Sequence, residues 1–338
     1  MSFWDCCDER VGRKDISFIV PNDKLDEGIG LSLNNSICPH KIAHRDLFKT
    51  FVNYSDECDD NDDIAISIRE IRGFGVLDTV GGELWEASLL LFSHILLNYE
   101  EKNYLDARIL EIGAGCGVPS LLLLELMKKH RKAHDKIYRS ITMTDNDNDV
   151  INNLCNLLAD SYQSQGANDN DIDNGDDKII VEIGHLDWTS YQYNIDDNNH
   201  ETLDMINSHY TNDKFDIIFG SACIYAPIHT NLADVIKYFL SGSCREVVII
   251  QIIDRPGFQS FLSRLTLLSV KYTLEVISDD VYDLSQNIRV EVENKNMSIG
   301  CDEEIIITKN ISYKVNGNAN CRPIVTNREF FVILKAFK

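Results

Sequence analysis

Basic residues are scarce in this 338-residue chain, which carries 32 Lys and Arg against 54 Asp and Glu, a formal net charge of −22. A field of that sign repels a phosphate backbone, so direct binding of nucleic acid is not expected, whereas basic partners are attracted. Much of the acidic excess falls in polar stretches that we interpret as loops, at 56–63, 169–177 and 196–197.

Signals for membranes, secretion and metals are also lacking. The apolar stretch 84–97 is amphipathic and too short to span a bilayer, and the polar N-terminus has no apolar core of a secretory signal. The ten cysteines form no C-x-x-C pair, and Cys38-Pro39-His40 is too small a group to hold zinc, so no metal site is predicted. Scattered cysteines indicate a reducing compartment, the cytoplasm or, alternatively, the nucleus.

The most informative stretch runs from Arg108 to Ser120. A buried strand over 109–112 ends in a glycine-rich turn, and a helix follows over 120–129. In an open α/β sheet, such a turn at the carboxyl end of a strand is where nucleotide-like ligands bind. Three glycines let a ligand approach the main chain closely: Gly113, Gly115 and Gly117.

The spacing of this turn argues against two common ligands. A dinucleotide fingerprint needs glycine at its sixth position, where this chain has Val118, and no Gly-Lys-Ser/Thr of a phosphate loop follows. Glu111, two residues before the first glycine, favours a cation. S-adenosylmethionine fits, because it has an adenosine, a sulfonium and an ammonium but no phosphate. The turn alone fits any nucleotide-type site, or a tight strand–helix turn, equally well.

A second carboxylate ends the next apolar strand, 141–145. Asp145 lies 32 residues after Gly113, so we expect it at the end of the neighbouring strand, where an acid accepts hydrogen bonds from a ribose diol. The alternative is that Asp145 or Asn146 caps the helix over 150–159, and both roles can hold together.

Strands and helices alternate along most of the chain, which predicts an α/β fold with a mainly parallel sheet. We expect strands at 64–71, 108–112, 140–144, 178–183, 215–220, 246–253, 272–277 and 329–337, with weaker ones at 16–20 and 304–308. We expect helices at 83–98, 118–130, 148–160, 230–240 and 257–268.

Four sequence blocks stand in a fixed order: Gly82-Glu-Leu-Trp-Glu-Ala-Ser88, the turn at 110–119, Leu186-Asp187-Trp188, and Ser221-Ala-Cys-Ile-Tyr225. Together they resemble the class I, seven-β-strand methyltransferases that use S-adenosylmethionine. Within that class they are similar to methyltransferase family 16, which is rich in protein-lysine methyltransferases. The resemblance covers about residues 64–270.

This resemblance implies a Rossmann-like, doubly wound, mostly parallel seven-stranded sheet with helices on both faces, plus an N-terminal β-containing extension. On this basis residues 1–80 are the extension, with a β-hairpin, and residues 81–338 are the methyltransferase domain. An acidic low-complexity loop at 161–177 and an excursion at 279–325 interrupt that domain.

The resemblance also implies site residues. Glu111 and the first glycines cradle the methionine part, Asp145 binds the ribose, and Asp187 and Trp188 lie at the adenine. The cofactor-binding positions are then Trp85, Glu111, Gly113, Ala114, Gly115, Asp145, Asp187, Trp188 and Ala222. For Trp85 the alternative is a core aromatic on an amphipathic helix, and for Trp188 a partly buried loop anchor.

One departure from the family concerns its Asp-x-x-Tyr block, which here reads Ala222-Cys-Ile-Tyr225. The tyrosine is kept, so Tyr225 is the predicted catalytic residue: its ring can hold an ammonium by cation–π contact and its hydroxyl can orient the nitrogen. The role of the missing acid cannot be transferred. His229 could reach the mouth of the pocket, but a solvent-facing histidine at the start of a helix is the favoured interpretation.

The sequence therefore predicts an S-adenosylmethionine-dependent enzyme, expected as a monomer, that N-methylates a lysine of a protein substrate, most naturally a basic one. The first alternative is a small-molecule N-methyltransferase with a closed acceptor pocket. The second is a non-catalytic adaptor that keeps the cofactor fold, which the missing acid at Ala222 makes conceivable.

Overall fold

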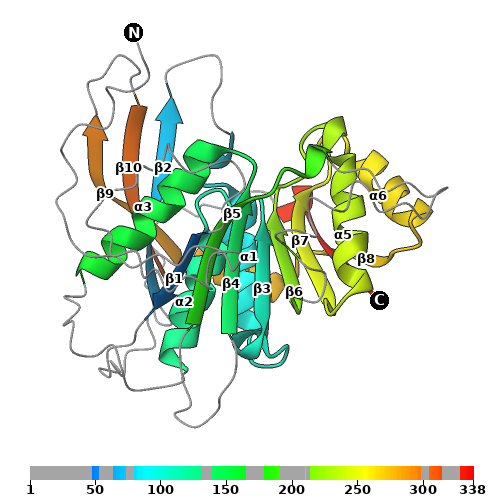
Figure 1. Ribbon diagram of the computed structural model, residues 1–338, viewed down its shortest axis with the longest axis horizontal. Coiled ribbons are helices and arrows are strands. Elements are labelled where there is room, and N and C mark those ends of the chain that lie inside the picture. The colour runs from blue at the N-terminus through cyan, green and yellow to red at the C-terminus, as the bar shows by residue number, and fades with distance from the viewer. Residues whose placement is uncertain are drawn as a thin grey trace, which may run out of the picture.

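Two β-sheets of unequal size organise the chain (Figure 1). The computed structural model describes residues 48–52, 64–73, 80–130, 139–164, 179–190, 210, 214–297, 304–313 and 328–338. The strand predicted at 16–20 lies outside these ranges, as does most of the acidic loop 161–177. No helix in the described part of the chain is long and apolar enough to cross a bilayer.

The larger sheet has eight strands in the order β1-β5-β4-β3-β6-β7-β11-β8. The five strands from β5 to β7 run parallel, while β11 pairs antiparallel with both β7 and β8. The strands are β1 (Phe48–Val52), β3 (Arg108–Ile112), β4 (Arg139–Asp145), β5 (Ile179–His185), β6 (Ile217–Ser221), β7 (Glu246–Ile252), β8 (Lys271–Val276) and β11 (Phe331–Phe337). The predicted Rossmann-like, mostly parallel seven-stranded sheet is thus confirmed, and β1 adds an antiparallel eighth strand at its edge.

Apolar side chains alternate between the two faces of this sheet, and each face has its own core. Ile109 and Phe219 pack with one core, whereas Leu110 and Ile218 pack with the other. Helices cover both faces: α1 (Glu86–Asn98), α2 (Val118–Lys129) and α3 (Asn148–Ser164) on the first, and α5 (Leu232–Ser241) and α6 (Phe258–Leu267) on the second. Each fully buried Leu or Phe contributes about 2 kcal/mol to this packing.

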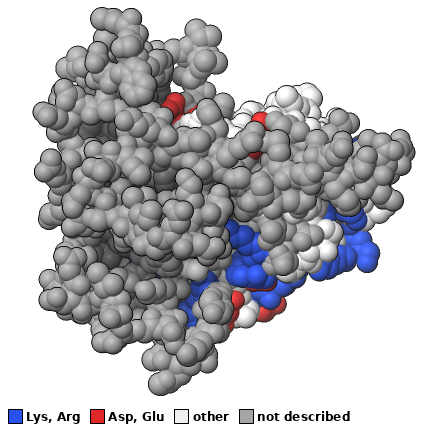
Figure 2. Space-filling view, in the orientation of Figure 1, with Lys and Arg blue, Asp and Glu red and all other residues white. Residues whose placement is uncertain are grey.

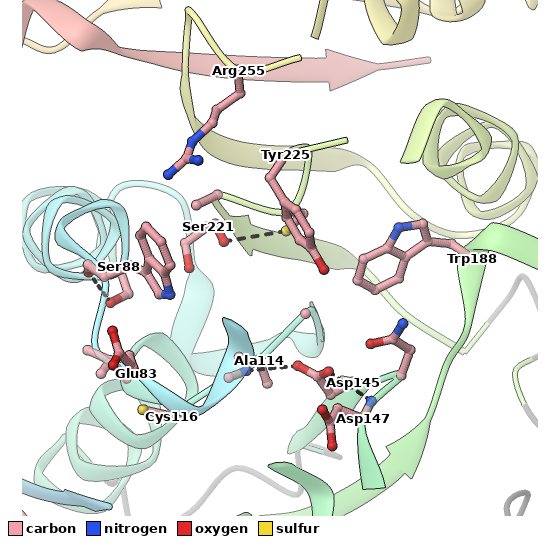
Figure 3. A pocket seen from close by; sticks show the side chains of 18 residues that line it. Glu83, Ser88, Ala114, Cys116, Asp145, Asp147, Trp188, Ser221, Tyr225 and Arg255 are labelled. Atoms are coloured by element: carbon pink, nitrogen blue, oxygen red, sulfur yellow. Dashed lines mark hydrogen bonds between the residues drawn. The ribbon is translucent and has the colours of Figure 1, made fainter. Parts of the chain in front are cut away.

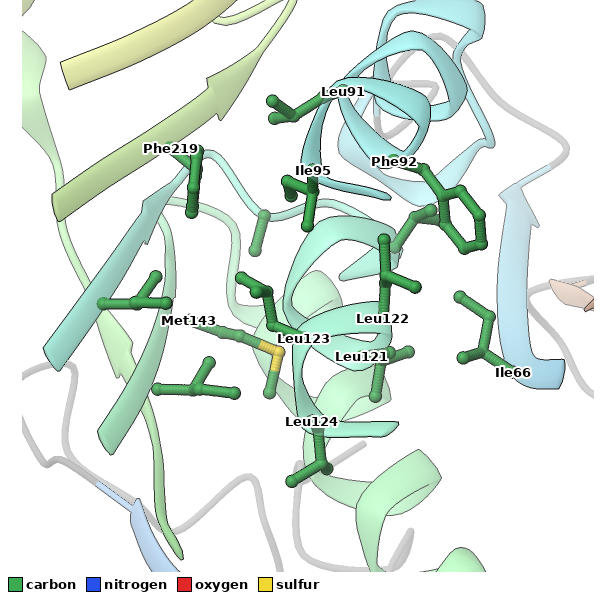
Figure 4. Close-up of a cluster of buried hydrophobic side chains, with 14 of the residues drawn as sticks. Ile66, Leu91, Phe92, Ile95, Leu121, Leu122, Leu123, Leu124, Met143 and Phe219 are labelled. Carbon is green, nitrogen blue, oxygen red and sulfur yellow. The ribbon is translucent and has the colours of Figure 1, made fainter. Parts of the chain in front are cut away.

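A smaller antiparallel sheet stands beside the first, in the order β2-β10-β9. Its strands are β2 (Ile64–Gly73), β9 (Ile288–Met297) and β10 (Glu304–Tyr313). Residues alternate between buried and exposed along β2, and the buried side chain of Ile66 meets Phe92 of α1 and Leu122 of α2 (Figure 4). The α1–α2 layer is therefore packed between two sheets.

The structure corrects one expectation about chain organisation. The excursion at 279–325 contains a helix, α7 (Asp279–Gln286), as well as β9, and the strand expected only at 304–308 runs on to residue 313 as β10. The hairpin expected within residues 1–80 stays a prediction, because the structure describes only part of that range. The strands described there, β1 and β2, belong to different sheets and do not pair with each other. Their partners lie far along the chain, so no local pattern revealed the pairing.

A buried ion pair lies within the small sheet, and its carboxylate also contacts the main fold. Lys309 on β10 lies 2.5 Å from the carboxylate of Glu70 on β2, which is 1% exposed. The same carboxylate accepts a hydrogen bond of 3.0 Å from the backbone N–H of Leu84. Glu70 therefore holds the segment that leads into α1.

Lys309→Met removes one partner of this buried ion pair. We expect it to lower the free energy of unfolding by about 3 kcal/mol, because breaking a buried ion pair from one side is costly. The matched control is Lys335→Met, which breaks a pair with Glu275 whose side chains are 21% and 45% exposed, and should cost less than about 1 kcal/mol. Urea unfolding of both variants checks this, and equal losses would contradict it.

Candidate functional site

A cavity of about 540 Å³ opens where β3, β4 and β6 end (Figure 3). That volume is in the range of small-molecule sites. The cavity collects residues from six regions of the sequence: the entry to α1, the glycine turn, the end of β4, and the segments after β5, β6 and β7. Among the residues that line it are eight predicted site residues: Trp85, Gly113, Ala114, Gly115, Asp145, Trp188, Ala222 and Tyr225.

The floor of the cavity is the turn after β3, which only glycine can form. Gly115 has a φ of +53°, and a Cβ there would lie 2.9 Å from the carbonyl oxygen of Gly81. Gly113 has a φ of +63°, and a Cβ there would lie 3.1 Å from Cη2 of Trp188. The left-handed backbone and the close neighbours therefore exclude side chains at both positions.

Asp145 ends β4 beside this turn and is 5% exposed. Its carboxylate accepts one hydrogen bond from the N–H of Gly115 and one from the N–H of Asp147, each 3.1 Å long. Burial raises the pKa of Asp145 to about 6, although both hydrogen bonds oppose that rise. Each oxygen keeps a lone pair with which the group can accept hydroxyl donors from a ligand.

Trp188 forms one side wall of the cavity and points its six-membered ring toward it (Figure 3). It is 4% exposed, and its indole N–H has no hydrogen-bond partner among the described residues. His229 meets its ring edge-on, with centroids 6.0 Å apart. Trp188 therefore both anchors its loop and offers an aromatic surface to the cavity, and its contact with an adenine stays a prediction.

The segment after β6 carries the mouth of the cavity and is rigidly held. Ala222 has a left-handed φ of 51°, and its N–H donates to the carbonyl of Ile250. Gln251 on β7 is fully buried, and its amide both accepts from the N–H and donates to the carbonyl of Ile224, at 3.1 and 2.9 Å. This pair of hydrogen bonds fixes the backbone immediately before Tyr225.

Tyr225 stands at the mouth of the cavity, 37% exposed, with its hydroxyl directed inward (Figure 3). The ring of His229 packs edge-on against it, with centroids 4.0 Å apart. His229 is 4% exposed and its Nδ1 lies 2.9 Å from the carbonyl oxygen of Cys223, so the interpretation of a solvent-facing histidine was wrong. Burial lowers the pKa of His229, which keeps the ring neutral near pH 7.

Two predicted cofactor residues do not line the cavity. Glu111 lies two residues after Ile109 on β3, so both side chains point to the same face of the sheet. The side chain of Glu111 lies under α2, is fully buried, and accepts a hydrogen bond of 3.2 Å from the N–H of Ser120. Burial raises the pKa of Glu111 to about 8, so it is not the anionic neighbour of a cation expected from the sequence. Asp187 instead accepts two hydrogen bonds from Thr189 and starts the short helix that carries Trp188.

Sequence reasoning overlooked several lining residues, of which Arg255 is the most telling. It follows β7, and its guanidinium carbon lies 5.4 Å from the centroid of the Trp85 ring. Trp85 itself precedes α1 as its N-cap, one residue before the helix, rather than within it as predicted. Arg255 belongs to no motif, so only its position after a buried strand could have drawn attention to it.

Charge is unevenly placed on the described surface. The cavity is lined by three carboxylates, those of Glu83, Asp145 and Asp147. On the face shown in Figure 2, Lys and Arg side chains gather along the lower edge, the edge where the parallel strands begin. Residues of that edge include Arg108 and Arg245, at the amino ends of β3 and β7. The acidic cavity and the basic edge thus lie at opposite ends of the sheet.

The family model described as lysine methyltransferase matches residues 61–267 of the chain. A search of curated proteins finds no match. Among solved structures, a magnesium protoporphyrin IX methyltransferase from Synechocystis PCC 6803 with bound S-adenosylmethionine is 9% identical, with 66% of this chain and 78% of that chain covered and a TM-score of 0.33. A human methyltransferase 10 domain containing protein is 8% identical, with coverages of 68% and 83% and a TM-score of 0.31. TM-scores this low carry no information on reaction or substrate.

The buried Glu111 generates a prediction about pH and stability. Because its pKa is about 8 in the folded chain and 4.5 ordinarily, the folded state holds the proton more tightly than the unfolded chain does. Folding is therefore penalised progressively as pH rises from about 4.5 to about 8. Glu111→Gln removes that penalty, so its stability relative to the parent protein should improve between pH 5 and pH 8.

Chemical denaturation at several pH values measures this difference. Glu101→Gln, at an exposed position, is the control and should show no such trend. A stability difference for Glu111→Gln that stays constant over this pH range would show that the carboxyl group is ionised in the folded protein.

Proposed function

Because the chain belongs to the lysine methyltransferase family, we propose that it transfers a methyl group to the side-chain nitrogen of a lysine in a protein substrate. The observation that carries the proposal is the position of Tyr225. This half-exposed ring stands at the mouth of the same cavity whose floor is the Gly113–Gly115 turn. An acceptor nitrogen that passes Tyr225 arrives above that turn.

The methyl donor is S-adenosylmethionine, the cofactor of this family. The residues present fit it: the glycine turn forms a floor without side chains, and Asp145 keeps acceptor capacity for the ribose hydroxyls. Trp188 offers a flat surface for the adenine. When bound, the cofactor supplies a methyl group already activated by the sulfonium, so the protein has mainly to place the acceptor in line.

A lysine acceptor must lose its proton before it can react. With an ordinary pKa of about 10.4, deprotonation near pH 7 costs about 4–5 kcal/mol. The aromatic rings of Trp85 and Tyr225 desolvate the channel, and the sulfonium charge of the bound cofactor would disfavour a second positive charge nearby. Both effects lower the pKa of an incoming ammonium.

Tyr225 suits the acceptor role in two ways. The face of its ring can hold an ammonium or methylammonium, and its hydroxyl can accept a hydrogen bond that orients the nitrogen. His229 and the Gln251–Ile224 hydrogen bonds hold the ring and its backbone in place. Because Ala222 stands where the family usually has an acid, orientation of the acceptor depends more heavily on Tyr225 here.

The charge of the protein favours a basic substrate. The net charge is −22, and the carboxylates of Glu83 and Asp147 belong to the cavity lining. Complementary charge accelerates encounter and helps to select a partner more than it raises affinity. A lysine in a basic segment of a protein is therefore the acceptor that we propose.

The proposal is tested by transfer of tritiated methyl groups from S-adenosylmethionine to a cell lysate that lacks this protein. Label should appear in protein and, after acid hydrolysis, as methylated lysine, and the reaction with Asp145→Ala should lose it. Label found only in metabolites would favour a small-molecule N-methyltransferase. Cofactor binding by calorimetry without any transfer would favour a non-catalytic adaptor.

Asp145 should make cofactor affinity dependent on pH. The ionised carboxylate is the better acceptor for ribose hydroxyls, so affinity should fall as pH is lowered through about 6, the pKa of Asp145. Asp145→Asn should weaken binding by about 1–3 kcal/mol at pH 7.5 and flatten the pH dependence. Isothermal calorimetry from pH 5 to pH 8 measures both. A parent protein whose affinity does not vary over that range would speak against ribose binding by Asp145.

Tyr225 should act on the acceptor and not on the cofactor. Tyr225→Ala is expected to leave cofactor affinity nearly intact and to lower the methylation rate, because its contact forms only with the acceptor. Tyr225→Phe should do less harm if the ring matters more than the hydroxyl. The control is Ile228→Ala, at a 60% exposed position of the same loop. Loss of cofactor binding in Tyr225→Ala, with turnover spared at saturating cofactor, would place the residue in the cofactor site.

A further inference from the structure

Among the described residues that line the cavity, Arg255 is the one Lys or Arg. Its guanidinium points into the cavity (Figure 3), and its central carbon lies 5.4 Å from the centroid of the Trp85 ring. Within the described residues no carboxylate pairs with it, whereas Arg108, Arg139 and Arg264 each have an acidic partner. A cation in a cavity without a protein counter-ion is a place for an anionic group of a ligand.

Backbone contacts fix the turn that carries Arg255, so its side chain starts from a defined position at the cavity. The N–H of Arg255 donates to the carbonyl of Ile252, and Phe258 donates back to the carbonyl of Arg255. Gly257 has a φ of +91°, and a Cβ there would lie 2.5 Å from the carbonyl oxygen of Ala226. The turn after β7 thus packs directly against the segment that carries Tyr225.

The cavity and the cofactor have complementary charge patterns. The carboxylates of Asp145 and Asp147 lie at the end of β4, on the other side of the cavity from Arg255 (Figure 3). S-adenosylmethionine carries one anionic group, its carboxylate, at the end of the molecule remote from the adenosine. With the ribose at Asp145 and the methionine part over the glycine turn, that carboxylate is directed toward the entry to α1, where Trp85 and Arg255 meet.

We propose that Arg255 binds the carboxylate of S-adenosylmethionine and thereby fixes the methionine part of the cofactor in the cavity. A guanidinium matches a carboxylate with two parallel N–H···O bonds, which set orientation as well as affinity. Trp85 supports the guanidinium plane from one side. Neutralised in this way, the carboxylate does not attract the ammonium form of an acceptor lysine.

The test compares two ligands that differ only in this group, S-adenosylmethionine and decarboxylated S-adenosylmethionine. Calorimetry should show that Arg255→Gln weakens binding of the first by tenfold or more, about 1.4 kcal/mol, and leaves binding of the second within about twofold. Arg255→Lys keeps the charge but loses the planar fork, so it should fall between the parent and Arg255→Gln. No methyl acceptor is needed, so the result does not depend on the proposed substrate.

The matched control is Arg245→Gln, the same change at an exposed arginine just before the opposite end of β7. It should bind both ligands as the parent does. Equal weakening of both ligands in Arg255→Gln and Arg255→Lys would mean that the residue shapes the cavity, and would overturn the proposal. So would unchanged affinity for both ligands. Retained binding of the decarboxylated ligand shows at the same time that the variant is folded.

Discussion

The hydrogen bond from the N–H of Gly115 to the carboxylate of Asp145 fixes the site, because it joins the glycine turn to the end of the neighbouring strand. Parallel pairing brings β3 and β4 to the same edge, and this bond sets how the turn folds back over them. Gly81 then packs its carbonyl against Gly115, and Glu70 holds the following segment through Leu84. The hydrogen bond to the buried carboxylate of Asp145 therefore positions the glycine turn, and the contacts of that turn position the neighbouring walls of the cavity.

The elements with a strong local signal could be predicted from the sequence. The strands β3 and β4 are short apolar runs, and the turn between β3 and α2 requires left-handed residues that glycine supplies. For the small sheet, the sequence predicted a strand at 64–71 and a weaker one at 304–308, but not how these strands pair. Its strands β2 and β10 lie about 240 residues apart and are polar on one face, so their pairing depends on tertiary contacts that no window of sequence contains.

The residues of the site also divide into those that the sequence revealed and those that depend on tertiary packing. Asp145 was found because it ends an apolar strand, and Trp188 and Tyr225 because their sequence blocks resemble those of the family. All three line the cavity. The side chain of Glu111 was wrongly expected in the cavity, because in a sheet buried on both faces a polar residue need not point toward the ligand. Its position on β3 places the side chain on the face covered by α2. Arg255 was missed because its importance arises from where the turn after β7 packs, which the residue types alone do not reveal.

The order of the large sheet has a consequence for how the chain folds. The strand β11 lies between β7 and β8, yet both of its neighbours precede it in the sequence by more than 50 residues. During synthesis, β8 has no partner until β11 is made, and one edge of β7 stays open for the same interval. An unpaired apolar edge is prone to associate with other chains. The nascent chain therefore has a vulnerable period that begins when β7 leaves the ribosome and ends when β11 inserts.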